Sequence, residues 1–383
     1  MSIQPPNIRH LAAFAATVRH GSVTRAARAV NLTQPALTQA IARFERDLDC
    51  ALFEREPGGM RPTEPALLLA PRAEAALARI GSPRVTATQM RAFLALARGG
   101  SYSTAAERTG LSAASLHRAV NDLSVALGER LVERRGRHLA LTRKGESRVR
   151  NFGLAMAEIR SGLSEVANWL GQAGGRIVIG AMPLSRARWL PRAILAFTRQ
   201  FPTVDISVVE GSHSELVGPL RDGDIDFLLG ALRQDEDLED LDQSPVFEDR
   251  PRLAMRRDHP LASKPETEAR DLMAYAWALP PTNTPLRGYW EAMVREAGGE
   301  PPHVGIECGS VLTIRELLLE TDMLTLLSPD QLRVEIDAGL LVSRAPPSPV
   351  RRIIGITSRR DWHPTAQQRE MVQTLHTVAP KDS

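Results

Sequence analysis

A stretch of polar and basic side chains between Gly21 and Arg46 has the composition and spacing of a DNA-reading surface. Its second half predicts a helix whose apolar residues share one face, at i, i+4, i+7 and i+11: Leu37, Ile41, Phe44 and Leu48. The opposite face carries hydrogen-bond donors and cations: Gln34, Thr38, Gln39, Arg43 and Arg46. Ser22 and Thr33 precede the two expected helices, where hydroxyls accept from unpaired backbone N–H groups. The stretch therefore predicts a helix-turn-helix that presents its second helix to a DNA major groove.

The flanking residues predict the elements that hold this stretch in place. Residues 7–19 predict a first helix with three apolar residues turned inward, Leu11, Phe14 and Val18. After Leu48, two short extended segments flank a Pro-Gly-Gly turn at residues 57–59, and the second segment ends at Thr63. Such a turn is typical of a hairpin, which here forms a wing. We therefore predict a winged helix-turn-helix domain over residues 1–66.

A shift of 79 positions without a gap reproduces this domain further along the chain. Core, turn and cap positions all find a counterpart of the same kind: Phe93, Gly100, Ser101, Ala105, Ala106, Leu111, Leu116, Val120, Leu123, Leu127 and Thr142. Because the register holds across some 57 positions, coincidence is a poor explanation. Residues 86–145 are therefore predicted to form a second winged helix-turn-helix domain.

The two copies differ on the surfaces that would face DNA. Arg43 and Arg46 of the first copy become Asp122 and Val125 in the second. The second recognition helix offers other donors: His117, Arg118 and Asn121. The second wing is the more basic one: Arg130, Arg134, Arg135, Arg137, His138, Arg143 and Lys144. We infer that the first copy reads bases, whereas the second chiefly grips the DNA backbone or contacts a partner domain; comparable DNA binding by both copies is the alternative.

Charge favours a nucleic-acid partner for the N-terminal part. The net charge is +3 over 383 residues, but residues 1–150 hold 23 Lys/Arg against 12 Asp/Glu, a net +11, and residues 151–383 hold 25 against 33, a net −8. A basic N-terminal part suits a polyanion. The chain shows no signal-like start and no run of eighteen apolar residues, so we expect a cytoplasmic protein that does not enter a membrane. The only cysteines, Cys50 and Cys308, suit a reducing compartment.

Two helices are predicted to connect these domains to the rest of the chain. Residues 67–85 are expected to form a connecting helix, which Pro71 kinks or restarts. Residues 146–174 are expected to form a longer linker with apolar residues every three or four positions: Val149, Phe152, Met156, Ile159, Leu163, Val166 and Leu170. This stripe predicts either a dimerisation helix or packing on its own domain, and the sequence leaves both open. The glycine-rich residues 171–175 mark the main boundary.

Residues 175–383 change to a strand-helix-strand rhythm. Short apolar strands such as Ile177–Gly180 and Ile225–Gly230 alternate with helices such as Arg186–Phe201, which predicts right-handed crossovers and a parallel sheet. An acidic loop then leads to a second set with four expected strands: Arg252–Met255, Tyr275–Leu279, Val304–Glu307 and Met323–Leu327. We expect lobe I over about 175–234 and 360–383 and lobe II over about 235–359. A cleft whose walls can hinge would lie between them.

With these motifs in view, the chain resembles the LysR-type transcriptional regulators over nearly its whole length. The stretch GSVTRAARAVNLTQPALTQAIARFERDL followed by LFERE is similar to the family's DNA-binding domain, and specifically so. The stretches GRIVIGAMPL, VVEGSHSEL and DIDFLLGALR are similar, less specifically, to the first lobe of its inducer-binding domain. The resemblance implies all-α-rich winged helix-turn-helix domains, here in two copies, and an α/β two-lobed effector domain like the periplasmic binding proteins. The second winged helix departs from the family's usual single copy. The geometry of the operator and the number of chains that bind it are therefore left open.

The resemblance also implies partners and DNA-facing residues. A member of this family would bind double-stranded promoter DNA as a homodimer or homotetramer, sense a small-molecule inducer, act on RNA polymerase, and need no cofactor. The DNA-facing residues, several of them carried over by position, are Ser22, Thr33, Gln34, Pro35, Thr38, Gln39, Arg43, Arg55 and Arg61, and in the second copy Arg118, Arg134, Arg135 and Arg137. The glutamines suit adenine edges and Arg43 suits guanine or phosphate, each good bidentate pair discriminating by about 1–3 kcal/mol.

Candidate effector residues lie in loops at the carboxyl ends of the expected strands, where α/β sheets bind ligands. They are Pro183, Ser185, Ser212, His213, Thr282, Thr284, Ser310 and Ser328, with Asn283 between two of them. Two of these loops precede helix starts, where free N–H groups favour an anion. We therefore predict a carboxylate or sugar-acid inducer, although hydroxyls at such positions serve equally well as ordinary helix caps.

No motif indicates an enzyme or a metal site. The chain contains no Walker loop, nucleophile elbow or HExxH sequence, and its histidines are scattered. Cys308 lies two residues before Ser310, which suggests redox sensing, but a single buried thiol is the simpler interpretation. The competing function is a small-molecule-binding or protein-interaction module in which one or both winged helices do not read DNA. The basic N-terminal part argues against that alternative.

Overall fold

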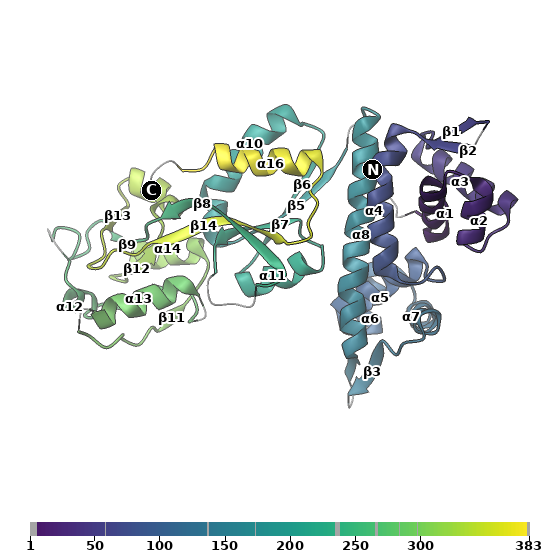
Figure 1. The fold of residues 1–383 in the computed structure, drawn as a ribbon. Coiled ribbons are helices and arrows are strands. Elements are labelled where there is room, and N and C mark those ends of the chain that lie inside the picture. Colours follow the sequence, from purple (N-terminus) through teal and green to yellow (C-terminus); the bar gives the residue numbers. More distant parts are fainter. Residues whose placement is uncertain are drawn as a thin grey trace.

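The computed structural model describes residues 6–57, 59–135, 138–172, 174–233, 238–264, 267–282, 284–296 and 298–380. A helical N-terminal part and a two-lobed α/β part lie on opposite sides of the long helix α8 (Arg143–Trp169) (Figure 1). Within these ranges, no helix has the length and apolar character that crossing a lipid bilayer requires.

The first N-terminal unit packs three helices and a hairpin around aromatic side chains. Its elements are α1 (Ile8–His20), α2 (Val23–Ala29), α3 (Gln34–Leu48), β1 (Phe53–Glu56) and β2 (Gly59–Pro62). The ring of Phe14 on α1 lies 5.6 Å from that of Phe44 on α3 and 5.9 Å from that of Phe53 on β1, measured between centroids. The predicted stripe on α3 is buried except for Leu48, which is half-buried. Burial of one face of α3 leaves its opposite face to solvent.

The second N-terminal unit contains the same elements in the same order. They are α5 (Ala87–Gly99), α6 (Tyr102–Thr109), α7 (Ala113–Leu127), β3 (Val132–Arg135) and β4 (His138–Leu141). Each of them begins 79 residues after its counterpart in the first unit. Leu116, Val120 and Leu123 of α7 are fully buried, like the stripe of α3. The ring of Phe93 packs on Phe152 of α8, with 6.2 Å between the centroids.

The helix starts of the two units are capped differently. The Thr33 hydroxyl accepts from the Ala36 amide at 3.3 Å, which confirms the predicted cap of α3. Ser22 stands at the N-cap position of α2 but makes no capping hydrogen bond there, so the predicted bond is wrong. Its counterpart Ser101 does cap α6, accepting from the Thr104 amide at 3.1 Å.

Helix α4 (Glu64–Ile80) lies alongside α8 through most of its length (Figure 1). Both helices begin before the expected boundaries at 67 and 146, directly after Thr63 and Thr142 at the N-cap positions. The expected restart at Pro71 is wrong, because α4 runs through this proline, which is exposed, whereas the alternative of a kink stays a prediction. The apolar stripe of α8 joins one core with α4 and the two units, so it packs within its own chain.

Lobe I is built on a five-stranded sheet of order β6-β5-β7-β14-β8. Its strands are β5 (Arg176–Ala181), β6 (Asp205–Glu210), β7 (Phe227–Ala231), β8 (Leu241–Asp249) and β14 (Arg352–Arg359). Its helices are α9 (Pro183–Ala187), α10 (Trp189–Gln200), α11 (His213–Arg221) and α16 (Ala366–Thr377). Helices α10 and α16 cover one face of the sheet and α11 covers the other. Strand β5 is parallel to β6 and β7, as predicted, whereas β14 is antiparallel to β7 and β8.

The sheet moves the boundary between the lobes away from the predicted one. Strands β8 and β14 fall in the ranges expected for lobe II, about 235–359, yet they pair with each other and β14 pairs with β7 of lobe I. The chain therefore crosses between the lobes near residues 250–251 and again between 344 and 352. The acidic loop expected to mark the boundary lies partly in residues 234–237, outside the described part.

Lobe II has a smaller antiparallel sheet of order β12-β9-β13 and a separate parallel pair, β10 with β11. Its strands are β9 (Arg252–Arg256), β10 (Ala278–Leu279), β11 (Ile306–Glu307), β12 (Thr325–Leu327) and β13 (Leu341–Arg344). Its helices are α12 (Ala269–Leu272), α13 (Pro285–Glu296), α14 (Val311–Glu320), the 3₁₀ turn Pro329–Gln331 and α15 (Arg333–Asp337). Trp277 and Trp290 pack at 5.3 Å in its core. The predicted second parallel set is therefore mainly an antiparallel sheet.

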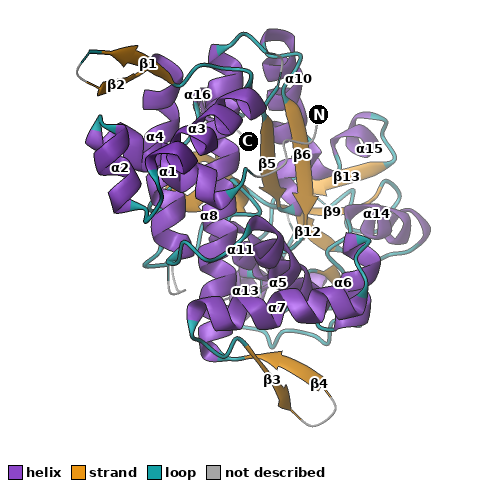
Figure 2. Ribbon diagram, turned by 90° about the vertical axis from the view of Figure 1, so that its right-hand side faces the viewer, coloured by secondary structure: helices purple, strands orange, loops and turns teal. Residues whose placement is uncertain are grey.

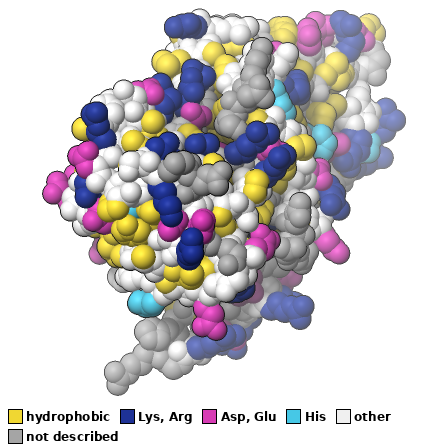
Figure 3. Space-filling model, turned by 90° about the vertical axis from the view of Figure 1, so that its left-hand side faces the viewer, with side chains coloured by type: hydrophobic (Ala, Val, Ile, Leu, Met, Phe, Trp, Pro, Cys, Tyr) yellow, Lys and Arg dark blue, Asp and Glu magenta, His cyan; other side chains and the backbone are white. Residues whose placement is uncertain are grey.

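Lobe I rests on α8 through the turn at residues 222–226. A Cβ added at Gly153 of α8 would stand 2.1 Å from the Asp222 carbonyl oxygen, so only glycine allows this approach. Arg160 of α8 donates to the carbonyl oxygen of Gly223 at 3.1 Å. Arg98 of the second unit pairs with Asp224 of the same turn. The far face of the lobes carries basic, acidic and apolar side chains mixed together, without one dominant charge (Figure 3).

Candidate DNA-binding surface and effector cavity

The exposed face of α3 presents polar side chains without partners. Thr38, Gln39 and Arg43 are exposed, and their side chains make no hydrogen bond or ion pair with the described residues. They project because Leu37, Ile41 and Phe44, on the other side of the helix, are buried. Donors held on a packed helix yet free of internal partners are available to base edges and phosphates.

The start of α3 is fixed more tightly. The Gln34 amide nitrogen donates to the Thr24 hydroxyl at 3.0 Å, a bond that links α3 to α2. Pro35 stands in the first turn of the helix, where its missing N–H costs nothing. Gln34 therefore orients α3 against α2, and its second N–H and its carbonyl oxygen remain available to a base.

The first wing contains one arginine without an internal partner and one that is paired. Arg55 on β1 is exposed and has no side-chain partner among the described residues. Arg61 on β2 pairs with Glu54 and, at 2.8 Å, with Glu56. The hydrogen bond that Arg61 donates to the Glu54 carboxylate is the main cause that raises the pKa of Arg61. Arg61 therefore needs to leave its carboxylates before it can contact a phosphate.

The second unit presents a different surface on α7. Arg118 is exposed without a described partner, as is Asp122, which replaces Arg43. The His117 ring packs against Tyr102 of α6, with 5.2 Å between centroids, which limits its freedom. Asp122 would repel a nearby phosphate. This helix is therefore poorer in free donors than α3.

The second wing supplies the positive charge that α7 lacks. Arg134 and Arg135 are exposed on β3, and the Arg135 Nε lies 2.8 Å from the Glu133 carboxylate. The predicted Arg137 and the His138 side chain fall outside the described part. Figure 2 views the N-terminal units from the side opposite the lobes and shows the two wings at opposite ends of this face.

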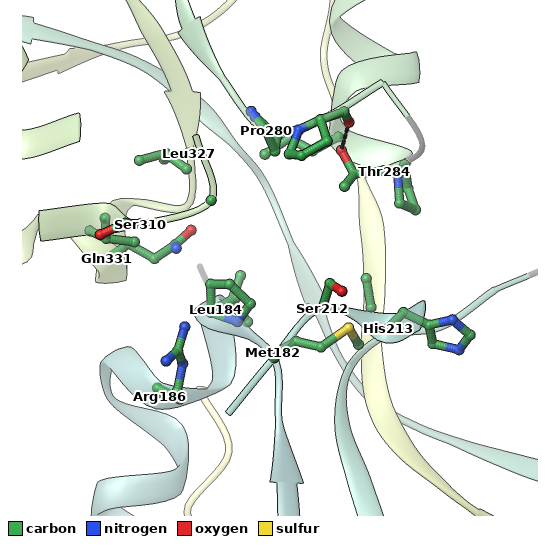
Figure 4. Close-up of a pocket in the computed structure, with 18 of the residues that line it drawn as sticks. Met182, Leu184, Arg186, Ser212, His213, Pro280, Thr284, Ser310, Leu327 and Gln331 are labelled. Carbon is green, nitrogen blue, oxygen red and sulfur yellow. Dashed lines mark hydrogen bonds between the residues drawn. The ribbon is translucent and has the colours of Figure 1, made fainter. Parts of the chain in front are cut away.

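A cavity of about 1180 Å³ lies between the two lobes. Lobe I contributes the loops that follow β5, β6 and β7, and lobe II contributes the starts of α13 and α14. The residues labelled in Figure 4 surround this space: Met182, Leu184, Arg186, Ser212, His213, Pro280, Thr284, Ser310, Leu327 and Gln331. Its position at the carboxyl ends of parallel strands is where ligands bind in α/β folds.

Five of the eight predicted effector residues line this cavity: Pro183, Ser212, His213, Thr284 and Ser310. The other three do not: Ser185 and Ser328 are buried and Thr282 is exposed outside the lining. Asn283 lies outside the described part. The imidazole of His213 points away from the centre of the cavity (Figure 4). Most of the predicted loops thus lie at the cavity, whereas the direction of each side chain depends on the fold.

The sequence did not indicate three arginines that line the cavity: Arg186, Arg233 and Arg352. Arg186 pairs with Glu210, and the Arg352 Nε lies 2.6 Å from the buried Asp249 carboxylate. Arg186 directly follows a predicted loop, so its neighbours were a usable signal. Arg352 had none, because β14 reaches lobe I only through long-range strand pairing.

Hydrogen bonds fix two serine hydroxyls in the lining of the cavity, and an ion pair joins the lobes close to it in sequence. The Ser310 hydroxyl accepts from the Thr313 amide at 3.3 Å and caps α14. The backbone amide and the hydroxyl of Ser212 both donate hydrogen bonds to the Glu215 carboxylate at 2.7 Å. The hydrogen bond from the backbone amide is the main cause that lowers the pKa of Glu215. Between the lobes, Arg188 pairs with Asp330 at 3.1 Å. That pair links lobe I to lobe II, and each partner is the chain neighbour of a lining residue, Ala187 or Gln331.

The Cys308 thiol lines the cavity and is only half-buried, in contrast to the buried thiol predicted. Its sulfur accepts from the Ser310 amide at 3.3 Å. Cys50, the other cysteine, lies at the end of α3 in the first unit. Across the described ranges, no group of three or more His, Cys, Asp or Glu side chains is arranged to hold a metal ion.

Family models match both parts of the chain. A model of the LysR substrate binding domain matches residues 170–380, more than half of the chain. A model of the bacterial regulatory helix-turn-helix proteins of the lysR family matches residues 8–67 and, a second time, residues 87–146. The two helix-turn-helix matches are again displaced by 79 residues.

Similar proteins and solved structures agree with these models. The HTH-type transcriptional regulator GalR of Pseudomonas putida is 32% identical over 354 residues, which cover 89% of each chain. The SDS degradation transcriptional activation protein of Pseudomonas sp. is 30% identical over 66% of this chain and 82% of its own. The fold of CbnR, a LysR family transcriptional regulator, matches with a TM-score of 0.54 at 20% identity, over 77% of this chain and 99% of CbnR. A full-length OxyR variant from Pseudomonas aeruginosa also matches at 0.54, with 22% identity over 76% of this chain and 93% of its own.

These matches settle the class of the protein. Regulators of this family bind DNA and small-molecule effectors and are not enzymes. Because the matches cover the helix-turn-helix and the lobes alike, the chain belongs to the LysR family of bacterial transcriptional regulators.

Proposed function

We propose that this LysR-family regulator binds promoter DNA through both N-terminal units and responds to a carboxylate or sugar acid in the cavity between its lobes. The free polar face of α3 carries the DNA part of this proposal, because Thr38, Gln39 and Arg43 have no internal partner among the described residues. Base readout in a major groove requires a polar face of this kind on a helix whose opposite face is packed into the protein.

In this proposal the two winged helices divide the work. Gln39 and Arg43 read base edges, Arg55 and Arg61 hold phosphates beside them, and Gln34 orients α3 against α2. The second unit chiefly grips the backbone through Arg118 and its basic wing, since Asp122 weakens base contacts by α7. The chain acts as a homodimer or homotetramer, and RNA polymerase is the further partner.

Hydrogen-bond donors in the cavity support an anionic effector. Three arginines stand in its lining, although Arg186 pairs with Glu210 and Arg352 pairs with the buried Asp249. The start of α14 also opens into it, where unpaired N–H groups favour negative charge. Hydroxyls of Ser310 and Thr284 would suit the hydroxyl groups of a sugar acid.

The contact between lobe I and α8 supplies a route from effector to DNA. Strand β7 runs from the turn at residues 222–226, which rests on α8, to Ala231 in the cavity lining. A ligand that shifts the lobes would thereby shift a turn that also pairs with Arg98 of the second unit. Differential binding of the effector to two lobe arrangements is sufficient for regulation.

The DNA part is tested by measuring affinity for the chain's own upstream region by fluorescence anisotropy at several salt concentrations. A regulator loses affinity linearly on a log-log plot as salt rises, and prefers the upstream region over scrambled DNA. Affinity that is insensitive to both salt and sequence would favour the competing function, a small-molecule or protein-binding module.

The effector part is tested by thermal-shift screening of sugar acids and aromatic carboxylates. Ser310→Leu should abolish the stabilisation that a ligand gives the native protein and leave DNA binding without ligand unchanged. Thr282→Leu is the matched control, because Thr282 is exposed outside the lining. An unchanged shift in Ser310→Leu would place the ligand elsewhere.

A further inference from the structure

Helices α4 and α8 occupy equivalent places after the two N-terminal units. Each begins directly after a threonine at its N-cap position, Thr63 and Thr142, and the two starts are 79 residues apart, like all other elements. The first seventeen residues of α8 are therefore the counterpart of α4. The helix that ends each unit is thus the helix that packs against the other one (Figure 1).

The contacts between these helices are reciprocal. Leu69 near the start of α4 lies against Gly162, where an added Cβ would stand 2.7 Å from its Cδ1 atom. Arg148, the counterpart of Leu69 in α8, lies against Gly81 at the end of α4, 3.1 Å from an added Cβ. The counterpart of Gly81 is Arg160, two positions from Gly162. The start of each helix therefore meets the end of its counterpart, which is the arrangement of a two-fold-related, antiparallel pair.

The pair is held firmly. Arg72 of α4 is buried and makes ion pairs with two carboxylates of α8, Glu158 at 3.0 Å and Glu165 at 3.2 Å. Ala76 and its counterpart Ala155 are both fully buried. Removing one partner of a buried ion pair is strongly destabilising, so these helices do not separate easily. The orientation of the two units is consequently fixed within one chain.

This packing places both N-terminal units, with α3 and α7, on the side of α8 that lies opposite the lobes. Seen from the side opposite the lobes, α3 and α7 both belong to the units facing the viewer, and the wings extend at opposite ends (Figure 2). In two-fold helix-turn-helix proteins, the symmetry of the protein is matched by two half-sites about one helical turn apart on the DNA. Here the two halves of that arrangement come from one chain.

We propose that a single chain binds two adjacent and unlike half-sites on one duplex, using the α4–α8 pair as an internal dimer interface. The inference rests on the proposed DNA binding by both units. Because α3 and α7 present different side chains, the two half-sites differ: the half under α3 carries base specificity, and the half under α7 is held mainly through phosphates. A dimer of chains would then occupy two such bipartite sites.

The test selects a binding site for the full-length protein from a random DNA pool and measures chains per duplex by native mass spectrometry. A duplex of about 25 base pairs, slightly over two helical turns, holds one selected site. With duplex in excess, one chain per duplex is expected, as a monomer or as a dimer carrying two duplexes. Two chains on one duplex would overturn the proposal, since each chain would then supply only half of the site.

Hydroxyl-radical footprinting assigns the halves. We expect two protected segments about one helical turn apart, of which the double substitution Arg134→Ala/Arg135→Ala removes only one. Arg43→Ala should weaken the preference for particular bases at the other protected segment alone. Arg351→Ala, an exposed arginine on the lobes, is the matched control and should change neither segment. A palindromic site whose two halves both respond to Arg43→Ala would contradict the assignment.

Failure of this inference is separable from failure of the proposed function. If the pool yields no enriched sequence and binding is insensitive to salt, DNA binding itself is refuted. If a sequence is enriched but only one segment is protected per chain, DNA binding stands and the internal pairing on one duplex is refuted.

Discussion

The two N-terminal units share their elements but not their surfaces. The positions that fill the core are matched one for one, as Phe14 and Phe93 are, and every helix and strand begins at the same offset. The exposed positions differ, since Arg43 faces solvent on α3 where Asp122 faces solvent on α7. Packing restricts the buried positions to a few residue types, whereas an exposed position is free to follow its ligand. The pair therefore shows one fold with two different exposed surfaces.

The largest expected effect comes from truncating one buried phenylalanine in the core of each unit. Phe14→Ala and Phe93→Ala should each destabilise the protein by about 3–5 kcal/mol, as truncation of a buried phenylalanine does. Phe14 packs on Phe44 and Phe53 of its own unit, but Phe93 packs on Phe152 of α8. Hydrogen exchange should therefore accelerate within residues 8–62 in Phe14→Ala. In Phe93→Ala it should accelerate within residues 87–141 and, in addition, along α8. Equally fast hydrogen exchange along α8 in both variants would contradict this difference between the two cores.

The next effect concerns sequence reading. Arg43→Ala should lower discrimination against a wrong base pair by about 1–3 kcal/mol, because it removes a potential bidentate contact. The same change at the equivalent position, Asp122→Ala, should cost no specificity. Competition binding against single-base variants of the selected site measures both. A comparable loss of specificity in Asp122→Ala would mean that α7 reads bases as α3 does.

A smaller effect compares the caps of α2 and α6. Ser101→Ala should destabilise the protein by about 1 kcal/mol, because it removes a capping bond to the Thr104 amide. Ser22→Ala should cost no more than a few tenths, since the Ser22 side chain makes no such bond. Denaturant unfolding monitored by circular dichroism gives both free energies. Equal losses would show that Ser22 caps α2 in solution.

The smallest effect concerns long-range charge on α7. Asp122→Asn removes one negative charge from the surface of α7 that we propose to face DNA. A plot of log affinity against log salt concentration should therefore become steeper by about 0.9 at most. Arg135→Ala should make it shallower by a similar amount and leave the preferred sequence unchanged. Anisotropy titrations at several salt concentrations measure both slopes. Unchanged slopes in both variants would place the second unit away from DNA.

Local features of the N-terminal part could be predicted because they repeat at short range. The stripe from Leu37 to Leu48, the cap at Thr33 and the 79-residue repeat follow from spacing alone, and the helices occupy the expected places. The bond of Ser22 could not be predicted, because the identity of a cap residue does not fix its rotamer. Pro71 was misjudged for a related reason: packing against α8 stabilises α4 enough to continue through it.

The effector cavity could be predicted only in outline. The loops after β5 and β6 were located by the rule that ligands bind at the carboxyl ends of parallel strands, and five candidate residues do line the space. Ser185 and Ser328 were included because their neighbours suit a ligand, yet both are buried in the lobes. Whether a loop side chain points inward is decided by what packs behind it.

By itself, the sequence determined the order of the N-terminal helices and hairpins, their recurrence at a fixed offset, the unequal charge of the two halves and the change to an α/β rhythm after residue 175. These features are local or periodic, so they are visible in residues that lie close along the chain. Only the tertiary structure decided that β14 joins the sheet of lobe I and brings Arg352 to the cavity. It also decided that the apolar stripe of α8 packs against α4 and the two N-terminal units. The choice between packing within the chain and packing against another chain depends on side chains far apart in the sequence.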